Sequence, residues 1–166
     1  MDKWRHHPAV RVLASIARSG ELGLVVSLES RRLGWGNPHD DVDAIWNLAP
    51  HDLAIVQEVL GFVPVPRWAV AELDRSGPCG LLGVLGTGPI AVVEVSARHP
   101  ERRREVRLAC EEGVAVLSGD GDHLLVARNG EDAERLERRR APGPPPLLAE
   151  LQAFVTYLHE IRKSVV

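Results

Sequence analysis

Three stretches of the chain repeat apolar residues every three or four positions, which is the spacing of an amphipathic α-helix. The first runs from Pro8 to Ser19 and is followed by Gly20, a residue suited to end a helix. The second runs from Ile45 to Gly61 and the third from Leu147 to Arg162. The apolar stripe of the third is the most continuous: it comprises Leu147, Leu151, Phe154, Val155, Leu158 and Ile161.

Short apolar runs bounded by turn residues predict the β-strands. One strand, Leu24 to Leu33, lies between the first two helices, and all the others follow the second helix in succession. These later strands are predicted at Trp68–Leu73, Cys79–Val84, Ile90–Ala97, Arg104–Cys110, Gly113–Leu117 and His123–Arg128. Successive strands with short turns favour antiparallel pairing, so the sequence predicts a meander.

This order of elements predicts an α+β fold: an open, mostly antiparallel β-sheet with helices packed on one face. The charged and proline-rich segment from Asn129 to Pro146 is expected to cross the molecule as extended chain. Three strands, at Cys79–Leu82, Ile90–Val93 and Arg104–Cys110, look apolar on both faces. We therefore expect the second face of the sheet to serve oligomerisation, in a homodimer or tetramer.

Length and charge restrict the class of protein. A chain of 166 residues is expected to form a single domain over residues 1–166. Its net charge of −3 gives no general attraction to nucleic acid or to an anionic membrane, so neither is expected as a partner. Two arginine-rich runs, Arg102–Arg104 and Arg138–Arg140, are interleaved with glutamates, which is typical of a solvated surface.

The compartment is predicted from the cysteines and from the first residues. Cys79 and Cys110 stand far apart without a metal-ligand spacing, as in proteins of a reducing cytoplasm. The start, Asp2-Lys3-Trp4-Arg5, is polar, and no later run approaches the ~20 apolar residues that span a bilayer. We therefore predict a cytoplasmic protein.

Two segments resemble ligand motifs without matching them. The loop from Gly34 to Asp43 contains His39, Asp40, Asp41 and Asp43, but their spacing fits no standard zinc or calcium site, and helix capping explains the aspartates. The run from Gly83 to Gly88 has the wrong order for GxGxxG and no helix after it, so it is interpreted as a hairpin. No metal and no cofactor bound by this chain alone are expected.

The candidate polar site lies at the start of the second helix. Asn47 and His51 are four residues apart, so a helix that begins near Trp46 places the amide and the imidazole on one side. Together they could bind a hydroxylated ligand. Pro50 suits the first turn of a helix and kinks a helix anywhere deeper, and spacing alone favours the interpretation of His51 as a capping or buried histidine. Both interpretations stay open on spacing alone.

Four stretches of the chain resemble the C-terminal domain of the Gfo/Idh/MocA oxidoreductases, in the branch that acts on sugars and nucleotide sugars. They are HPAVRVLASIARSGELG at His7–Gly23, ESRRLGWG at Glu29–Gly36, DVDAIWNLAPHDLAIVQEVLG at Asp41–Gly61 and PPLLAELQAFVTYL at Pro145–Leu158. In that family a nicotinamide-binding Rossmann domain precedes this one. The sequence contains neither a strand-GxGxxG-helix unit nor a Glu-Lys-Pro segment, so NAD or NADP is expected only through a partner domain.

The resemblance also implies roles for individual residues. The family's catalytic Asp-x-x-x-His pair falls on Asn47 and His51, so His51 is the expected catalytic residue and the carboxylate is replaced by an amide. An amide can bind a hydroxyl but carries no charge to raise the basicity of an imidazole. Substrate contacts are expected from Asn47, Arg32, Trp35 and Asp43.

Three hypotheses follow. The leading one is a stand-alone substrate-binding and oligomerisation domain of a sugar or nucleotide-sugar oxidoreductase, inactive alone and dependent on a separate Rossmann-domain chain. The alternative is a non-catalytic binding or scaffold protein that reuses this fold, which the amide at Asn47 favours. The third is that the sequence is a fragment of a longer protein.

Overall fold

The computed structural model describes residues 3–164 except 38, 40, 76 and 131–135. It contains a short 3-10 helix, η1 (Lys3–His6), and the helices α1 (Pro8–Ser19), α2 (Ala44–Leu60) and α3 (Pro146–Ser164). The strands are β1 (Val25–Trp35), β2 (Pro66–Asp74), β3 (Gly77–Leu85), β4 (Ile90–Ser96), β5 (Arg98–Cys110), β6 (Gly113–Ser118), β7 (His123–Arg128) and β8 (Glu137–Arg140).

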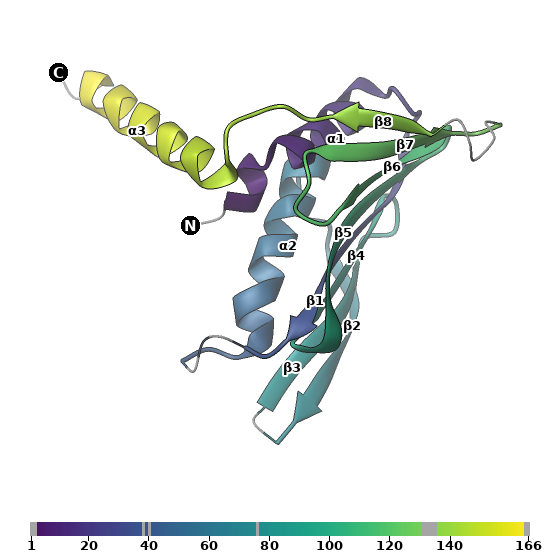
Figure 1. The fold of residues 1–166 in the computed structure, drawn as a ribbon, viewed down its shortest axis with the longest axis vertical. Helices are drawn as coiled ribbons and strands as arrows, with labels where there is room; N and C mark the ends of the chain where they lie inside the picture. Colours follow the sequence, from purple (N-terminus) through teal and green to yellow (C-terminus); the bar gives the residue numbers. More distant parts are fainter. Residues whose placement is uncertain (1–2, 38, 40, 76, 131–135, 165–166) are drawn as a thin grey trace.

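The eight strands form one open sheet in the order β2-β3-β4-β1-β5-β6-β7-β8 (Figure 1). All neighbouring pairs are antiparallel except β1 and β4, which run parallel. The first strand in the sequence is therefore inserted into the middle of the sheet. This arrangement confirms the predicted α+β fold with an open, mostly antiparallel sheet.

The helices α1 and α2 cover one face of the sheet (Figure 1). His7 caps α1 by accepting the N–H of Ala9 at Nδ1, and Gly20 ends the helix in the left-handed conformation. The α1 stripe, with Leu13 and Ile16 buried, packs toward α2, which in turn lies over β1, β3 and β4. The core between these layers is built on aliphatic side chains, including Leu28, Ile55, Val56, Val59, Val93, Leu108, Leu117 and Leu124.

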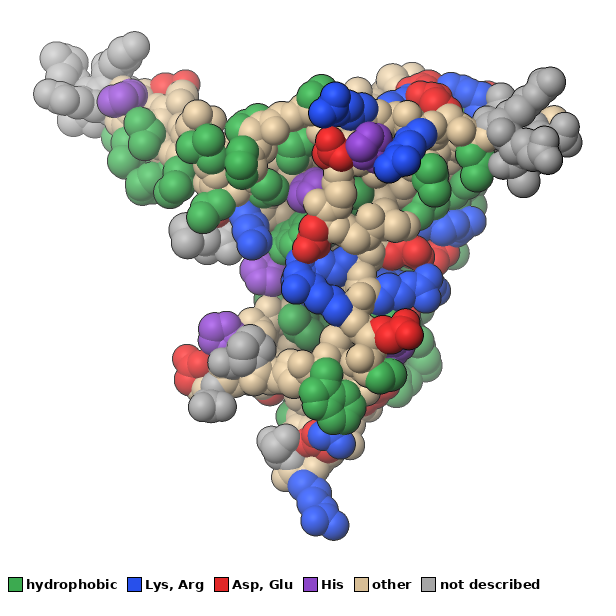
Figure 2. All heavy atoms as spheres, in the orientation of Figure 1, with side chains coloured by type: hydrophobic (Ala, Val, Ile, Leu, Met, Phe, Trp, Pro, Cys, Tyr) green, Lys and Arg blue, Asp and Glu red, His purple; other side chains and the backbone are tan. Residues whose placement is uncertain are grey.

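The third helix has an unusual position: α3 projects from the body and meets it through η1 at its start (Figure 1). The helix predicted over Leu147–Arg162 is confirmed. Its small residue Ala149 is buried, whereas the apolar stripe faces outward, with Leu151 47% exposed and Phe154 58% exposed. Figure 2 shows this stripe as a row of hydrophobic side chains along α3. No helix in the described part of the chain is long and apolar enough to cross a membrane.

The structure differs from the sequence-based prediction at one edge of the sheet. We predicted His123–Arg128 as the last strand, but the segment expected to be wholly extended crossing contains β8, Glu137–Arg140, paired with β7. The prediction was wrong because four charged residues show no alternation of apolar and polar positions. Charged side chains are typical of an edge strand, where they discourage further pairing.

The open face of the sheet is not uniformly apolar. Paired positions place Trp68, Val84 and Val92 in one row across β2, β3 and β4, and the row continues with Glu29 of β1 and Arg107 of β5. Glu29 accepts from Arg107 at 2.8 Å. The expectation that Arg104–Cys110 is apolar on both faces was therefore wrong: its second face carries charge. One apolar part of the open face lies on β2, β3 and β4, and apolar side chains return beyond the charged pair, at Val116 of β6 and Leu125 of β7.

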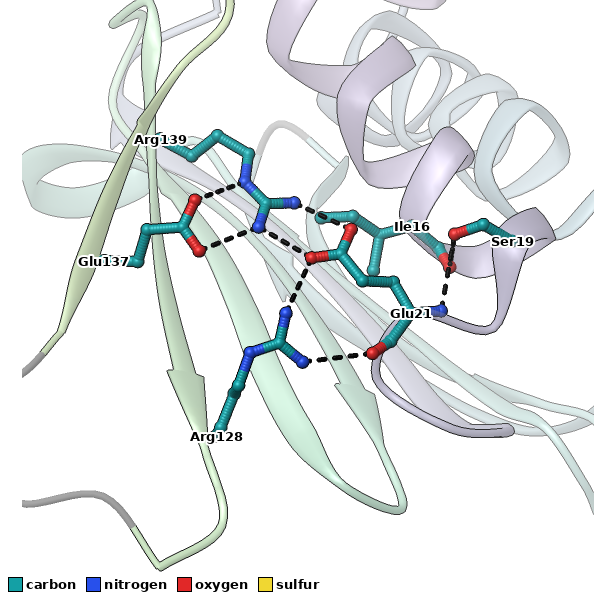
Figure 3. Close-up of polar contacts among 6 residues, drawn as sticks. All are labelled: Ile16, Ser19, Glu21, Arg128, Glu137 and Arg139. Carbon is teal, nitrogen blue, oxygen red and sulfur yellow. Dashed lines mark hydrogen bonds and ion pairs between the residues drawn. The ribbon is translucent and has the colours of Figure 1, made fainter.

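A network of ion pairs joins the turn after α1 to the far end of the sheet (Figure 3). Both carboxylate oxygens of Glu21 accept from the guanidinium of Arg139, at 2.7 and 2.9 Å, and Oε1 also accepts from Arg128 at 2.8 Å. Arg139 donates in addition to both oxygens of Glu137. The hydrogen bond with Arg139 holds the pKa of Glu21 below its usual value. This network ties the turn after α1 to β7 and β8.

Candidate functional site

A pocket of about 450 Å³ lies between η1, the end of β1, the start of α2 and β5. Four of the five predicted site residues line it: Asn47 and His51 from α2, and Arg32 and Trp35 from β1. The remaining described lining residues are Lys3, Trp4, Leu33, Gly34, Gly36, His39, Leu48, Ser96, Arg102 and Arg104. Residues far apart in the sequence are thus brought to one cavity.

The start of α2 sets the direction of the amide and the imidazole. Asp43 caps the helix by accepting the N–H of Trp46 at 2.9 Å, and helical geometry then places Asn47 and His51 on the same side. Pro50 lies inside the helix rather than in its first turn. Asn47 donates from Nδ2 to Oδ1 of Asn37 at 3.0 Å, which ties the loop before the helix to its first turn.

A buried ion pair fixes α2 against the central strand. Asp52, only 1% exposed, accepts from Arg32 Nε at 2.6 Å and from Ser30 Oγ at 2.6 Å. Since Asp52 follows His51 directly, this pairing sets the position of the imidazole relative to β1. The sequence contained a signal for it: Asp52 is in helical phase with Val56 and Val59, on the buried side.

Trp4 lies against two of the arginines that line the pocket, Arg32 and Arg104. The guanidinium carbons of Arg32 and Arg104 lie 4.7 and 4.8 Å from the centre of its ring, and the imidazole of His7 stacks on it at 5.5 Å. Burial lowers the pKa of His7, which keeps this imidazole neutral and able to accept at Nδ1, while Asp120 opposes that effect. The aromatic surface holds both arginines in fixed positions.

Asp43 does not share the pocket of the other four predicted residues. It lines a neighbouring pocket of about 440 Å³ together with Asp41, Asp74 and Arg98, and Gly36 and His39 border both pockets. Its carboxylate serves as the cap of α2. Within the described residues, no three His, Cys, Asp or Glu side chains gather as a metal site. Asp40, part of the loop considered for a metal, lies outside the described residues.

Sequence reasoning missed the basic residues of the pocket. Lys3 was interpreted only as part of a polar start, and Arg102 and Arg104 only as a solvated charged run. The available signal was the alternation along the strand: Arg102 and Arg104 are two apart and so share one face. That this face meets η1 follows from the tertiary fold, which single-sequence patterns do not contain.

The helix starts in the described part of the chain do not fit a dinucleotide. A pyrophosphate needs a glycine turn between a strand and an uncapped helix N-terminus. The start of α1 is blocked by His7 and Pro8, and α2 carries Asp43 as its cap with Asp41 beside it. α3 follows a run of prolines. With Asp43 as its cap, the N-terminus of α2 offers no free N–H groups to a pyrophosphate, so these helix starts do not supply a site for a nicotinamide cofactor.

The structure is similar to several solved oxidoreductases. UDP-N-acetylglucosamine 3-dehydrogenase GnnA from Acidithiobacillus ferrooxidans is 23% identical, with a TM-score of 0.77, over 96% of this chain and 51% of that one. KijD10, a 3-ketoreductase from Actinomadura kijaniata solved with TDP-benzene and NADP, is 16% identical with a TM-score of 0.81, over 96% of this chain and 52% of that one. A levoglucosan dehydrogenase in complex with NADH and L-sorbose is 17% identical with a TM-score of 0.67, over 86% and 46%.

The chain thus spans about half the length of the solved structures that it matches. These neighbours are Gfo/Idh/MocA-type oxidoreductases, and the coverage agrees with the resemblance to one domain of that family. At these identities the likeness shows the fold. No protein-family model matches the sequence, and no curated protein matches it either.

Proposed function

We propose that this chain is the substrate-binding and oligomerisation domain of a sugar or nucleotide-sugar oxidoreductase, and that any hydride transfer depends on a separate nucleotide-binding chain. The observation that carries the proposal is the pocket in which His51 and Asn47 meet Arg32 and Trp35. The fold supports the choice of reaction class, because its neighbours include dehydrogenases named for sugars and nucleotide sugars.

Each side chain has a role that fits a sugar. The imidazole of His51 is the group that would accept or donate the proton of a sugar hydroxyl, and the amide of Asn47 would position that hydroxyl. Trp35 is 70% exposed and offers an apolar face to a sugar ring. Arg32 is held by Asp52, so it would act as a fixed donor at the back of the pocket.

Two exposed apolar surfaces are available for two kinds of partner. The part of the open sheet face on β2, β3 and β4, with Trp68 and Val70 exposed, is the surface that we assign to a homodimer or tetramer. The stripe of α3 is the surface that we assign to the nucleotide-binding chain, since it lies on a separate projection of the molecule (Figure 1). Both cysteines are free and buried, in keeping with our proposal of a cytoplasmic protein.

A second candidate is a non-catalytic sugar-binding or scaffold protein. Asn47 favours it, because this amide stands where the resemblance implies a carboxylate and its Nδ2 already donates to Asn37. Such a protein would bind the same ligand in the same pocket without needing a proton-transfer group. The two candidates therefore differ in activity: with a nucleotide-binding partner the first would support hydride transfer, and the second would not.

Saturation-transfer NMR with a neutral sugar such as N-acetylglucosamine tests the proposal. We expect binding that His51→Ala weakens and that Gln57→Ala, an exposed control on the same helix, leaves unchanged. Equal effects of both variants, or no binding at millimolar sugar, would overturn the assignment of the pocket. Calorimetry with NAD or NADP should show no binding in the micromolar range for the chain alone, and a micromolar dissociation constant would contradict the need for a partner.

A further inference from the structure

The pocket beside α2 is basic although the chain has a net charge of −3. Four lining side chains are cationic, and none of the described lining residues is acidic. The cationic residues are Lys3, Arg32, Arg102 and Arg104. Two carboxylates contact this group from outside the pocket wall, Asp52 at Arg32 and Asp120 at the other two arginines. Among the side chains that line this pocket or pair with its lining arginines, cations therefore outnumber carboxylates, which favours a negatively charged ligand at this wall.

Two of these arginines share one carboxylate. Arg102 donates to Oδ2 of Asp120 at 3.2 Å and Arg104 donates to Oδ1 at 2.9 Å. Partial burial disfavours the charge of Asp120, but Arg104 and Arg102 outweigh it and lower its pKa. Even with Asp120 ionised, each guanidinium has five N–H donors, and one carboxylate satisfies only part of them.

The fold explains Arg104 but not Arg102. The side chain of Arg104 is largely buried, and its guanidinium is held by stacking on Trp4 and by the ion pair with Asp120. The side chain of Arg102 is 68% exposed, and an exposed ion pair of this kind adds little to stability. Arg102 lines the pocket all the same. Binding of a negatively charged ligand would explain why an arginine stands at this position, whereas its contribution to the stability of the fold does not.

We propose that Lys3, Arg102 and Arg104 form an anion subsite for the phosphate or diphosphate of a phosphorylated sugar. Guanidinium groups match phosphate oxygens with paired N–H donors, and an ammonium adds a point charge. In this arrangement the phosphate lies on the basic wall and the sugar lies against Asn47 and His51. The sugar half of the inference rests on the function proposed above, whereas the anion subsite is tested separately.

Calorimetry on the whole chain with four probes tests this subsite: pyrophosphate, N-acetylglucosamine, N-acetylglucosamine 1-phosphate and UDP-N-acetylglucosamine. We expect the phosphorylated ligands to bind more tightly than the neutral sugar and to weaken as salt is raised. Arg102→Gln should weaken them about tenfold, because a hydrogen bond to a charged group is lost. Arg103→Gln is the matched control: it removes the same charge from the next residue of β5, which points to the opposite face and pairs with Glu105.

The outcomes separate this inference from the proposed function. A neutral sugar that binds as tightly as its 1-phosphate, or equal effects of Arg102→Gln and Arg103→Gln, overturns the anion subsite and leaves the sugar pocket standing. Pyrophosphate binding that depends on Arg102, without binding of the neutral sugar, supports the subsite and counts against the sugar site. Binding of none of the probes overturns both. The 1-phosphate and the UDP-sugar together show whether one phosphate or a nucleotide diphosphate is preferred.

Discussion

Arg32 and Arg104 are paired directly across β1 and β5, so two positive charges face each other on adjacent strands of the covered face. Like charges in such positions normally destabilise a sheet. Here Trp4 lies under both guanidinium groups, and Asp52 and Asp120 supply one carboxylate each. The fold thus maintains a repulsive pair at the wall of its pocket. Conflicts of this kind are expected where a site is kept for binding.

The buried partner of Arg32 gives the first prediction. Asp52→Asn should destabilise the protein by about 3–5 kcal/mol, because it leaves a buried guanidinium without a counter-charge. Urea unfolding at neutral pH measures the change. The variant Arg32→Met/Asp52→Leu removes both charges and should recover part of the stability. A loss below about 1 kcal/mol in Asp52→Asn would show that Arg32 does not depend on this carboxylate.

The network around Glu21 gives the second prediction. Glu21→Gln should cost about 1 kcal/mol at neutral pH, because a partly exposed carboxylate loses a bidentate and a single arginine contact. The pKa of Glu21 is lowered in the folded protein, so its contribution is present above the unfolded value and disappears as the pH falls through the folded value. Urea unfolding of both proteins across the acid range should show the difference shrinking. A constant difference would contradict this account.

His7 gives a prediction with a different pH window. Burial lowers its folded pKa, so the unfolded chain takes up the proton first, and stability falls as the pH drops below the usual histidine range near 6.5. His7→Asn keeps a side-chain acceptor for the N–H of Ala9 but does not titrate. Its stability should therefore change less between pH 7.5 and 5.5, measured by urea unfolding. His159→Asn, an exposed histidine on α3, should behave as the wild type does.

The helices α1 and α2 could be predicted from the sequence, because a helix and its ends depend on the spacing of residues that are close together in the chain. The caps Gly20 and Gly61 and the helical phase of Leu53, Val56 and Leu60 were sufficient for α1 and α2. The parallel insertion of β1 beside β4 was not predictable, because it pairs residues about 60 positions apart that carry no mutual signal.

The same distinction applies to the candidate site. Asn47 and His51 could be paired from helix geometry alone, and the pocket contains both. Asp43 was predicted to contact the substrate, but it lies in the neighbouring pocket and its carboxylate caps α2. Lys3 and Arg102 reach the pocket only through packing of η1 against the sheet. The pattern of apolar and polar residues in these two segments gives no indication of that contact.

The last prediction concerns assembly, which we propose occurs through the apolar part of the open sheet face on β2, β3 and β4. Trp68 is 54% exposed on the edge strand β2, and Val70 lies beside it on the same face at 47%. A stable interface usually buries more than ~1,000 Å², which a twisted sheet face can supply more readily than one helix. We therefore expect a dimer or tetramer at tens of micromolar by sedimentation. Trp68→Lys/Val70→Lys should convert it to a monomer, since lysine on an edge strand opposes association.

The matched control is Leu151→Lys/Phe154→Lys, which places the same two charges on the exposed stripe of α3. If α3 is reserved for a different chain, this variant keeps the assembly of the wild type. Both pairs of side chains are exposed, so neither variant should lower the unfolding midpoint by much, and urea unfolding checks that. A monomeric wild type would contradict the sheet interface. A reversed result, with the α3 variant monomeric and the sheet variant unchanged, would place self-association on α3 and remove the basis for assigning that helix to a nucleotide-binding partner.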